Sequence, residues 1–119
     1  MKHTIATIMD LVCNHYSYSP QLIFAVTRER HIVEKRQIFF YLVRKYTNCT
    51  LSDIQRFTLE YRGSEINHAT IIHAVKAIGI LRVSDASIRE QVNEIESEIT
   101  GYNGVIVGSI DLLKLCNVA

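Results

Sequence analysis

The chain has 119 residues, of which 48% are hydrophobic, so it can form one compact domain around a single core. Its net charge of +1 singles out no class of partner, and it has neither a run of about 18 apolar residues nor a signal-peptide pattern, so a cytoplasmic protein without a membrane anchor is expected. The three cysteines, Cys13, Cys49 and Cys116, lack C-x-x-C spacing, which argues against a disulfide framework or a zinc ribbon and favours reduced, mostly buried thiols.

Helical periodicity dominates the first part of the chain. Apolar residues at helical spacing predict a first helix over residues 4–15. Ser19, as N-cap, and Pro20, at the first helical position, predict a short helix over residues 20–25. After the charged connector "TRERH", a third and longest apolar pattern runs from about residue 32 to residue 47. This third helix should form the spine of the core.

The next two predicted helices have the outline of a helix-turn-helix. Thr50 and Asp53 approximate a capping box at the start of a short helix over residues 51–57. Residues 59–66 contain a glycine and mixed charges, which predicts a loop. Asn67 is a suitable N-cap for a longer helix with an apolar stripe of Ile71, Ile72, Val75, Ile78 and Leu81. The connector is longer than the usual three or four residues of this motif.

The last third of the chain differs in character. Residues 85–99 predict an amphipathic helix with an acidic outer face. Residues 101–119 contain three glycines and then an apolar run, which predicts a turn or flexible segment and a short final helix that docks on the same core or on a second copy. The expected class is all-α, with a compact multi-helix domain over residues 1–100 and an extension over residues 101–119.

Charge is distributed unevenly along the chain. Residues 1–84 carry eleven Lys and Arg against six Asp and Glu, whereas residues 85–119 carry two against six. Six of the basic residues lie between Arg28 and Lys45, beside two acidic ones. A duplex-binding surface needs such a local basic patch to neutralise phosphates, although a solvated helix face fits the charge pattern equally well.

The stretch "SEINHATIIHAV" carries two histidines but does not have the spacing of a metal site. His68 and His73 are five positions apart, so a helix turns the second side chain roughly 140° away from the first. No H-E-x-x-H pattern, nucleophile elbow, P-loop or G-x-G-x-x-G sequence is present. We therefore expect no enzyme, metal, cofactor or small-molecule substrate. Asn67, His68 and Thr70 instead form a polar helix start, which suits base contacts in a major groove.

The order of these pieces resembles a known family. "RERHIVEKRQIFFYLVRKYTNCTLSDI" followed by "NHATIIHAVKAI" is similar to the C-terminal DNA-binding domain of DnaA, the bacterial chromosomal replication initiator. The resemblance covers roughly residues 5–99 and implies a Trp-repressor-like helix-turn-helix domain that binds double-stranded DNA. Its matching positions are Arg36, Gln37, Leu51, Ile54, His68, Thr70, Ile72, His73 and Ala74.

The resemblance also implies roles for individual residues. Arg28 takes the place of a basic-loop arginine that enters the minor groove, and Arg30 belongs to the same loop. The sugar-phosphate backbone would be contacted by Arg44, Thr47 and Leu51. Bases in the major groove would be read by Asn67, His68 and Ala69, with Thr70 beside them. His73 would point into the core.

The chain departs from the family pattern at the start of the recognition helix. "SEI" replaces the usual Gly-Gly-Arg, and extra residues precede it. Asn67 replaces an Asp, which predicts a shift of preference from cytosine to adenine, and Ala69 keeps only an apolar contact. One changed bidentate contact alters the discrimination between bases by about 1–3 kcal/mol, so we expect a preferred DNA sequence that differs from that of the family. The ATPase domain of the initiator has no counterpart in these 119 residues, so a free-standing module in replication initiation or its regulation is expected.

A rival hypothesis is a protein-interaction or dimerisation module with degenerate DNA binding. It would use the acidic helix over residues 85–99 and the apolar tail. Its partner would be a second copy of the chain or a replication protein.

Overall fold

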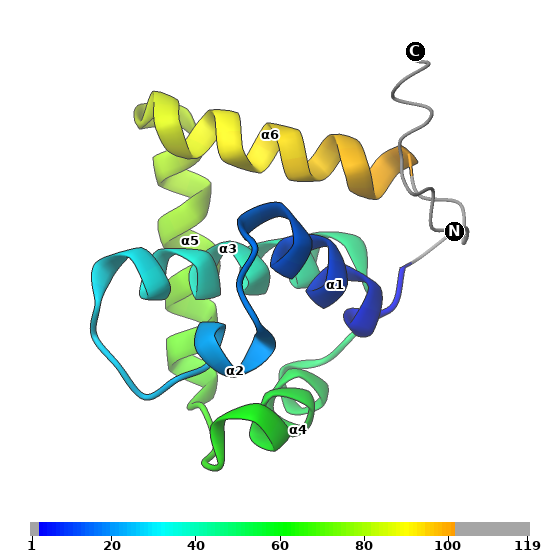
Figure 1. Cartoon of the computed structure of the whole chain (residues 1–119), viewed down its shortest axis with the longest axis vertical. Coiled ribbons are helices and arrows are strands. Elements are labelled where there is room, and N and C mark those ends of the chain that lie inside the picture. The colour runs from blue at the N-terminus through cyan, green and yellow to red at the C-terminus, as the bar shows by residue number, and fades with distance from the viewer. Residues whose placement is uncertain (1–2, 102–119) are drawn as a thin grey trace.

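In the computed structural model, residues 3–101 are described, and all regular secondary structure among them is α-helical. The helices are α1 (Ile5–Tyr16), α2 (Pro20–Ile23), α3 (Arg30–Tyr46), α4 (Leu51–Arg62), α5 (His68–Ser84) and α6 (Ala86–Gly101) (Figure 1). The predicted all-α class is confirmed. The short final helix expected after Gly101 lies outside the described residues. Within residues 3–101, no helix is both long and apolar enough to cross a membrane.

Helix α3 is the centre of the core, as its apolar pattern predicted. Ile38, Phe39, Leu42 and Val43 are fully buried on it. α3 packs against α5, and also against α1 and α2, while α6 packs against α1 and α5 (Figure 1). Helices α1, α2 and α5 therefore surround α3, whose inner face is buried.

Helix α4 is longer than the sequence pattern predicted. The expected helix over 51–57 and loop over 59–66 are wrong, because α4 continues to Arg62. Its inner face extends through aromatic packing: Phe57 stacks on Phe39 at 6.3 Å, and Tyr61 stacks on Phe24 at 6.3 Å between ring centroids. Such packing is a tertiary contribution to helix stability that local propensity does not contain.

The predicted helix starts are confirmed by side-chain caps. Ser19 Oγ accepts from the amide of Leu22 at 3.1 Å, with Pro20 in the first turn of α2. Thr50 and Asp53 form a complete capping box, in which each side chain accepts from the other's amide at 3.1 and 2.9 Å. These short polar side chains satisfy amides that have no partner inside the helix.

Two arginines hold the C-terminal end of α2. The side chain of Arg36 is buried and donates to the carbonyls of Ile23 and Ala25 at 2.8 and 2.6 Å. Arg62 donates at 3.5 Å to the carbonyl of Phe24, the residue between Ile23 and Ala25. Burial, together with the nearby charge of Arg62, lowers the pKa of Arg36. The cations thus satisfy the exposed carbonyl end of a short helix and fix the beginning of the loop that leads to α3.

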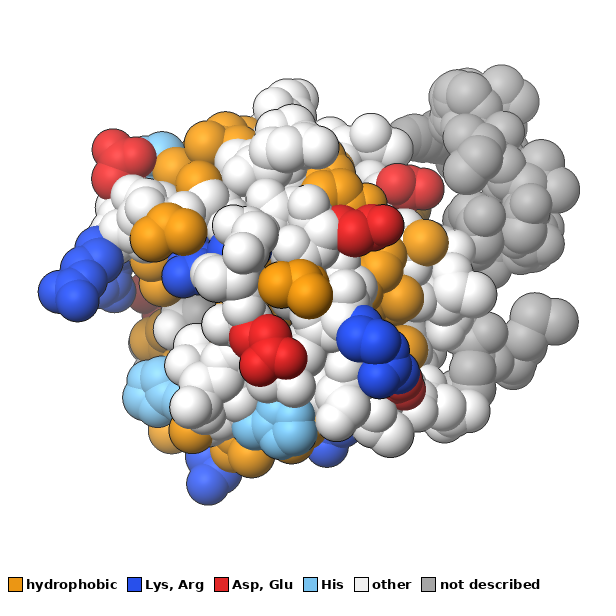
Figure 2. All heavy atoms as spheres, turned by 90° about the horizontal axis from the view of Figure 1, so that it is seen from below, with side chains coloured by type: hydrophobic (Ala, Val, Ile, Leu, Met, Phe, Trp, Pro, Cys, Tyr) orange, Lys and Arg blue, Asp and Glu red, His pale blue; other side chains and the backbone are white. Residues whose placement is uncertain are grey.

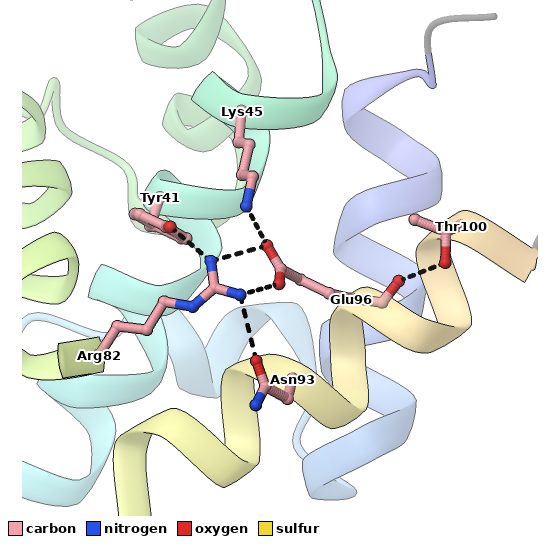
Figure 3. Close-up of polar contacts among 6 residues, drawn as sticks. All are labelled: Tyr41, Lys45, Arg82, Asn93, Glu96 and Thr100. Carbon is pink, nitrogen blue, oxygen red and sulfur yellow. Dashed lines mark hydrogen bonds and ion pairs between the residues drawn. The ribbon is translucent and has the colours of Figure 1, made fainter. Parts of the chain in front are cut away.

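A polar network around Glu96 joins α3, α5 and α6 (Figure 3). Lys45 of α3 donates to Glu96 Oε2 at 2.6 Å. Arg82 of α5 binds both carboxylate oxygens and also donates to Tyr41 at 2.8 Å and to Asn93 at 3.1 Å. Glu96, predicted to belong to an acidic outer face, is instead buried between three helices.

The environment of Glu96 favours its charged form. Burial raises the pKa of the carboxyl, but hydrogen bonds from Lys45 and Tyr46 and the charges of Lys45 and Arg82 outweigh burial and hold the pKa below its ordinary value of 4.5. The carboxylate therefore stabilises the fold at neutral pH, and this contribution is lost as the pH falls from about 4.5 through the lower pKa of the folded state.

We predict that Glu96→Gln lowers the free energy of unfolding by about 1–3 kcal/mol at neutral pH, because two cations lose their shared carboxylate. Urea denaturation at several pH values measures this effect. The difference between wild type and variant should shrink below about pH 4.5. Glu90→Gln, an exposed change on the same helix, is the matched control and should leave stability nearly unchanged. A difference that is constant down to acidic pH would contradict the prediction.

Candidate nucleic-acid interface

α4, a short connector and α5 form the helix-turn-helix. α4 ends at Arg62 and is capped by Gly63, whose φ of 83° is in the left-handed region and whose amide donates to Leu59 O at 2.8 Å. α5 begins at His68, so the connector consists of residues 63–67. Most of the expected loop over residues 59–66 is therefore the last turn of α4 and a connector of five residues. The expected long loop before the recognition helix is a misreading of this helical extension.

The start of α5 is fixed by its own cap and by an apolar anchor. Asn67 Oδ1 accepts from the amide of Ala69 at 2.7 Å, as an N-cap does. Ile66, immediately before the cap, and Ile71, in the first turns of the helix, both belong to the buried core. Apolar residues at these two positions form a hydrophobic staple, which sets the angle at which the chain enters a helix.

Gln55 of α4 makes a second connection to the start of α5. Its side-chain amide donates to the carbonyl of Ile66 at 2.7 Å, and its Oε1 lies 2.9 Å from His68 Nε2. The sequence analysis did not identify Gln55, because no motif contains it and both contacts join residues 11 and 13 positions apart. Only the fold brings Gln55 next to the N-terminal end of α5.

The N-cap and first turn of α5 present the three residues expected to read bases, with Thr70 beside them. Asn67, His68, Ala69 and Thr70 are all exposed, whereas Ile71, Ala74 and Ile78 are buried farther along the helix. The helix therefore offers polar and small side chains at its N-terminal end and is anchored by its apolar face. The positive end of the helix dipole also makes this end attractive to phosphate.

Two expectations for α5 are wrong. His73 is exposed and does not enter the core, and Ile72, assigned to the apolar stripe, is 41% exposed. The buried face contains Ile71, and each further residue turns about 100° around the axis. His73 therefore lies about 200° from Ile71, on the outer side of the helix.

The basic segment between Arg28 and Lys45 divides into internal and external charges. Arg36 is buried against the end of α2, and Lys45, although 42% exposed, is bonded to Glu96. Lys35 lies 4.7 Å from the centre of the Tyr16 ring and 3.9 Å from Glu34. The remaining three, Arg28, Arg30 and Arg44, are exposed. These are the three arginines that the resemblance placed against DNA.

The exposed arginines lie at different places on the surface. Arg28 and Arg30 line an open hollow of about 320 Å³ whose other walls are Val33, Glu34, Gln37 and Leu81. Arg44, near the end of α3, donates to Cys49 O at 3.3 Å. Figure 2 views the face of α4 and the start of α5, and shows Lys and Arg side chains at separate places among acidic, histidine and hydrophobic side chains. Positive charge on this face is therefore dispersed.

Thr47 and Leu51 are less accessible than the other expected contacts. Thr47 is only 6% exposed, and its hydroxyl donates to Val43 O at 2.7 Å and accepts from the amide of Cys49 at 3.1 Å. Leu51 is half-buried and packs against the core. Thr47 thus stabilises the turn between α3 and α4.

The geometry offers no arrangement for metal chemistry in the described part of the chain. Across residues 3–101, no cluster of three or more His, Cys, Asp or Glu side chains could hold a metal ion. Cys13 and Cys49 are free and half-buried. Burial and the charge of Asp10 raise the pKa of the Cys13 thiol to about 11, so this thiol is protonated and unreactive at neutral pH.

Comparison with known proteins agrees with this geometry. Residues 5–78 match the family described as bacterial DnaA protein helix-turn-helix. The chromosomal replication initiator protein DnaA of Bacteroides thetaiotaomicron is 39% identical over 95 residues, which are 79% of this chain and 19% of that protein. Its namesake in Bacteroides fragilis is 31% identical over 100 residues, 84% of this chain and 20% of that protein. The chain spans about a fifth of the length of these curated relatives. It belongs to the bacterial DnaA helix-turn-helix family.

Proposed function

We propose that this domain binds double-stranded DNA with sequence preference and inserts the first turn of α5 into the major groove. The observation that carries the proposal is the exposed row Asn67, His68, Ala69 and Thr70 at the start of a helix whose apolar face is buried. In helix-turn-helix proteins the N-terminal residues of the second helix contact base edges. Family membership supports the same arrangement.

The exposed arginines would supply contacts to the DNA backbone and minor groove. In the proposal Arg28 enters the minor groove next to the bound major groove, with Arg30 near it, and Arg44 contacts phosphate. Leu51 packs on the sugar-phosphate backbone, and Thr47 supports this contact from within the turn between α3 and α4. Each neutralised phosphate releases counterions, so affinity should fall steeply with salt.

The biological setting of this binding is also a proposal. The matched relatives are chromosomal replication initiator proteins, and this chain corresponds to about a fifth of each. We infer a role in replication initiation or in its regulation. Binding of DNA is the part of that role for which these residues account.

Arg28→Ala should weaken binding to all duplexes and lower the slope of log affinity against log salt by about 1, because one groove or phosphate contact is lost. Fluorescence titration of labelled duplexes at several salt concentrations measures both quantities. Arg89→Ala removes the same charge from the exposed part of α6 and is the matched control. Equal effects of the two variants would contradict a specific role for Arg28.

Asn67→Asp should change which base is selected without loss of the helix cap, since Asp caps helices as well as Asn. The cap uses one lone pair of Asn67 Oδ1, and the second lone pair and the amide hydrogens remain for adenine. Selection from a randomised duplex should show adenine preferred by the wild type and cytosine by the variant at one position, a change of about 1–3 kcal/mol. Identical selected sequences would exclude Asn67 as a reader.

Protein interaction is the second candidate function, because the far end of α5 carries exposed apolar side chains. Ile80 and Val83 are 68% and 78% exposed, close to the acidic helix α6. Among the glutamates of the expected acidic face of α6, Glu96 is internal, whereas Glu94 and Glu98 are exposed and lie 3.5 and 3.7 Å from His15. A partner surface would therefore combine Ile80 and Val83 with the outer face of α6.

If Ile80 and Val83 form a dimer contact, replacing both with Gln should weaken self-association at least about tenfold, because two buried apolar side chains per copy are lost. Sedimentation equilibrium measures the change. Val26→Gln alters another apolar residue that is 74% exposed and serves as the control. A wild-type protein that remains monomeric at all concentrations would exclude the dimer.

A further inference from the structure

The chemistry of the Gln55 contacts determines where His68 carries its proton. The carbonyl of Ile66 can only accept a hydrogen bond, so the Gln55 atom 2.7 Å from it is the amide nitrogen. The other end of that amide, Oε1, then faces His68 Nε2 at 2.9 Å. An amide oxygen can only accept, so His68 Nε2 must carry a hydrogen.

This assignment fixes the remaining nitrogen of the ring. A neutral imidazole has one N–H, so when Nε2 is the donor Nδ1 is an acceptor. No group within residues 3–101 hydrogen-bonds Nδ1 of His68, and the residue is exposed in the first turn of α5. Gln55 therefore leaves an acceptor of defined type at the surface of the recognition helix.

We propose that Gln55 is a positioning residue that makes His68 Nδ1 an acceptor, so that His68 selects an exocyclic amino group in the major groove. Adenine N6 and cytosine N4 are such donors, whereas thymine O4 and guanine O6 are acceptors and would face Nδ1 unfavourably. This inference rests on the proposed DNA binding by α5. It assigns to His68 a preference for amino over carbonyl bases.

A purely structural role for Gln55 makes a different prediction. If Gln55 only ties α4 to the connector, its loss would weaken binding to every sequence alike, through movement of α5. The proposed role adds a change at one base position and a change in the imidazole tautomer. These two readouts separate the alternatives.

The tautomer is measured by ¹⁵N NMR of the histidine side chains at about pH 8, where ordinary imidazoles are neutral. Wild-type His68 should be predominantly in the Nε2–H form, and Gln55→Met should shift it toward a mixture of tautomers. Gln91→Met is the matched control, because Gln91 also uses both ends of its amide, with Tyr16 and Ser87, on the α1–α6 side of the fold. A wild-type His68 in the Nδ1–H form would overturn the proposal without any reference to DNA.

The base preference is measured by selection from randomised duplexes with two variants of His68. The amide of asparagine reaches as far as Nδ1, and that of glutamine as far as Nε2. His68→Asn places an amide at the Nδ1 position, where its Oδ1 can still accept from adenine or cytosine but its Nδ2 can also donate to thymine or guanine, so the preference should weaken without being lost. His68→Gln keeps a donor for Gln55 and should reduce that preference at least about fivefold. Gln55→Met should reduce it in the same direction, by a smaller factor.

The outcomes distinguish this inference from the proposed function. If His68→Gln still binds duplexes in a salt-dependent manner and selects the same bases as the wild type, then His68 Nδ1 does not read a base. That result would leave the proposed duplex binding intact. Absence of wild-type binding to any duplex would overturn both, while the NMR spectrum would still show whether Gln55 sets the tautomer.

Discussion

The packing of α5 against α3 is the interaction on which the rest of the structure depends. Ile71, Ala74 and Ile78 bury one side of α5 against the core, and α3 supplies most of the opposing surface. A helix anchored along this length has a fixed axis. Its first turn therefore projects as a rigid extension of the core, and small local contacts are sufficient to orient the side chains there.

Polar contacts at both ends of α5 complete this placement. At the C-terminal end of α5, Arg82 binds Glu96, which also accepts a hydrogen bond from Lys45 (Figure 3). At the near end Gln55 joins the connector and His68. The basic residues divide accordingly: those bonded to backbone carbonyls or to Glu96 hold helices together, and Arg28, Arg30 and Arg44 are the ones proposed to contact DNA. A count of positive charges along the sequence does not make this distinction.

Local signals in the sequence predicted the helix starts well. Ser19, Thr50 and Asn67 cap helices through contacts within three residues, so the pattern alone contains the information. The length of α4 was missed because Tyr61 is stabilised by Phe24, 37 positions away. Glu96 and Gln55 were missed for the same reason, since their partners come from other helices and from the connector before α5. His73 was placed in the core on the basis of the family resemblance. The helical period instead puts it on the side of α5 opposite Ile71.

The central claim is that the first turn of α5, held by α4, is the part of the domain that meets bases. Its most direct test is an amide NMR titration of the ¹⁵N-labelled protein with a duplex obtained by selection. The largest shifts should fall on residues 67–70, with further shifts in the loop that carries Arg28 and at the end of α3. Shifts confined to the outer face of α6 and the far end of α5 would contradict the account.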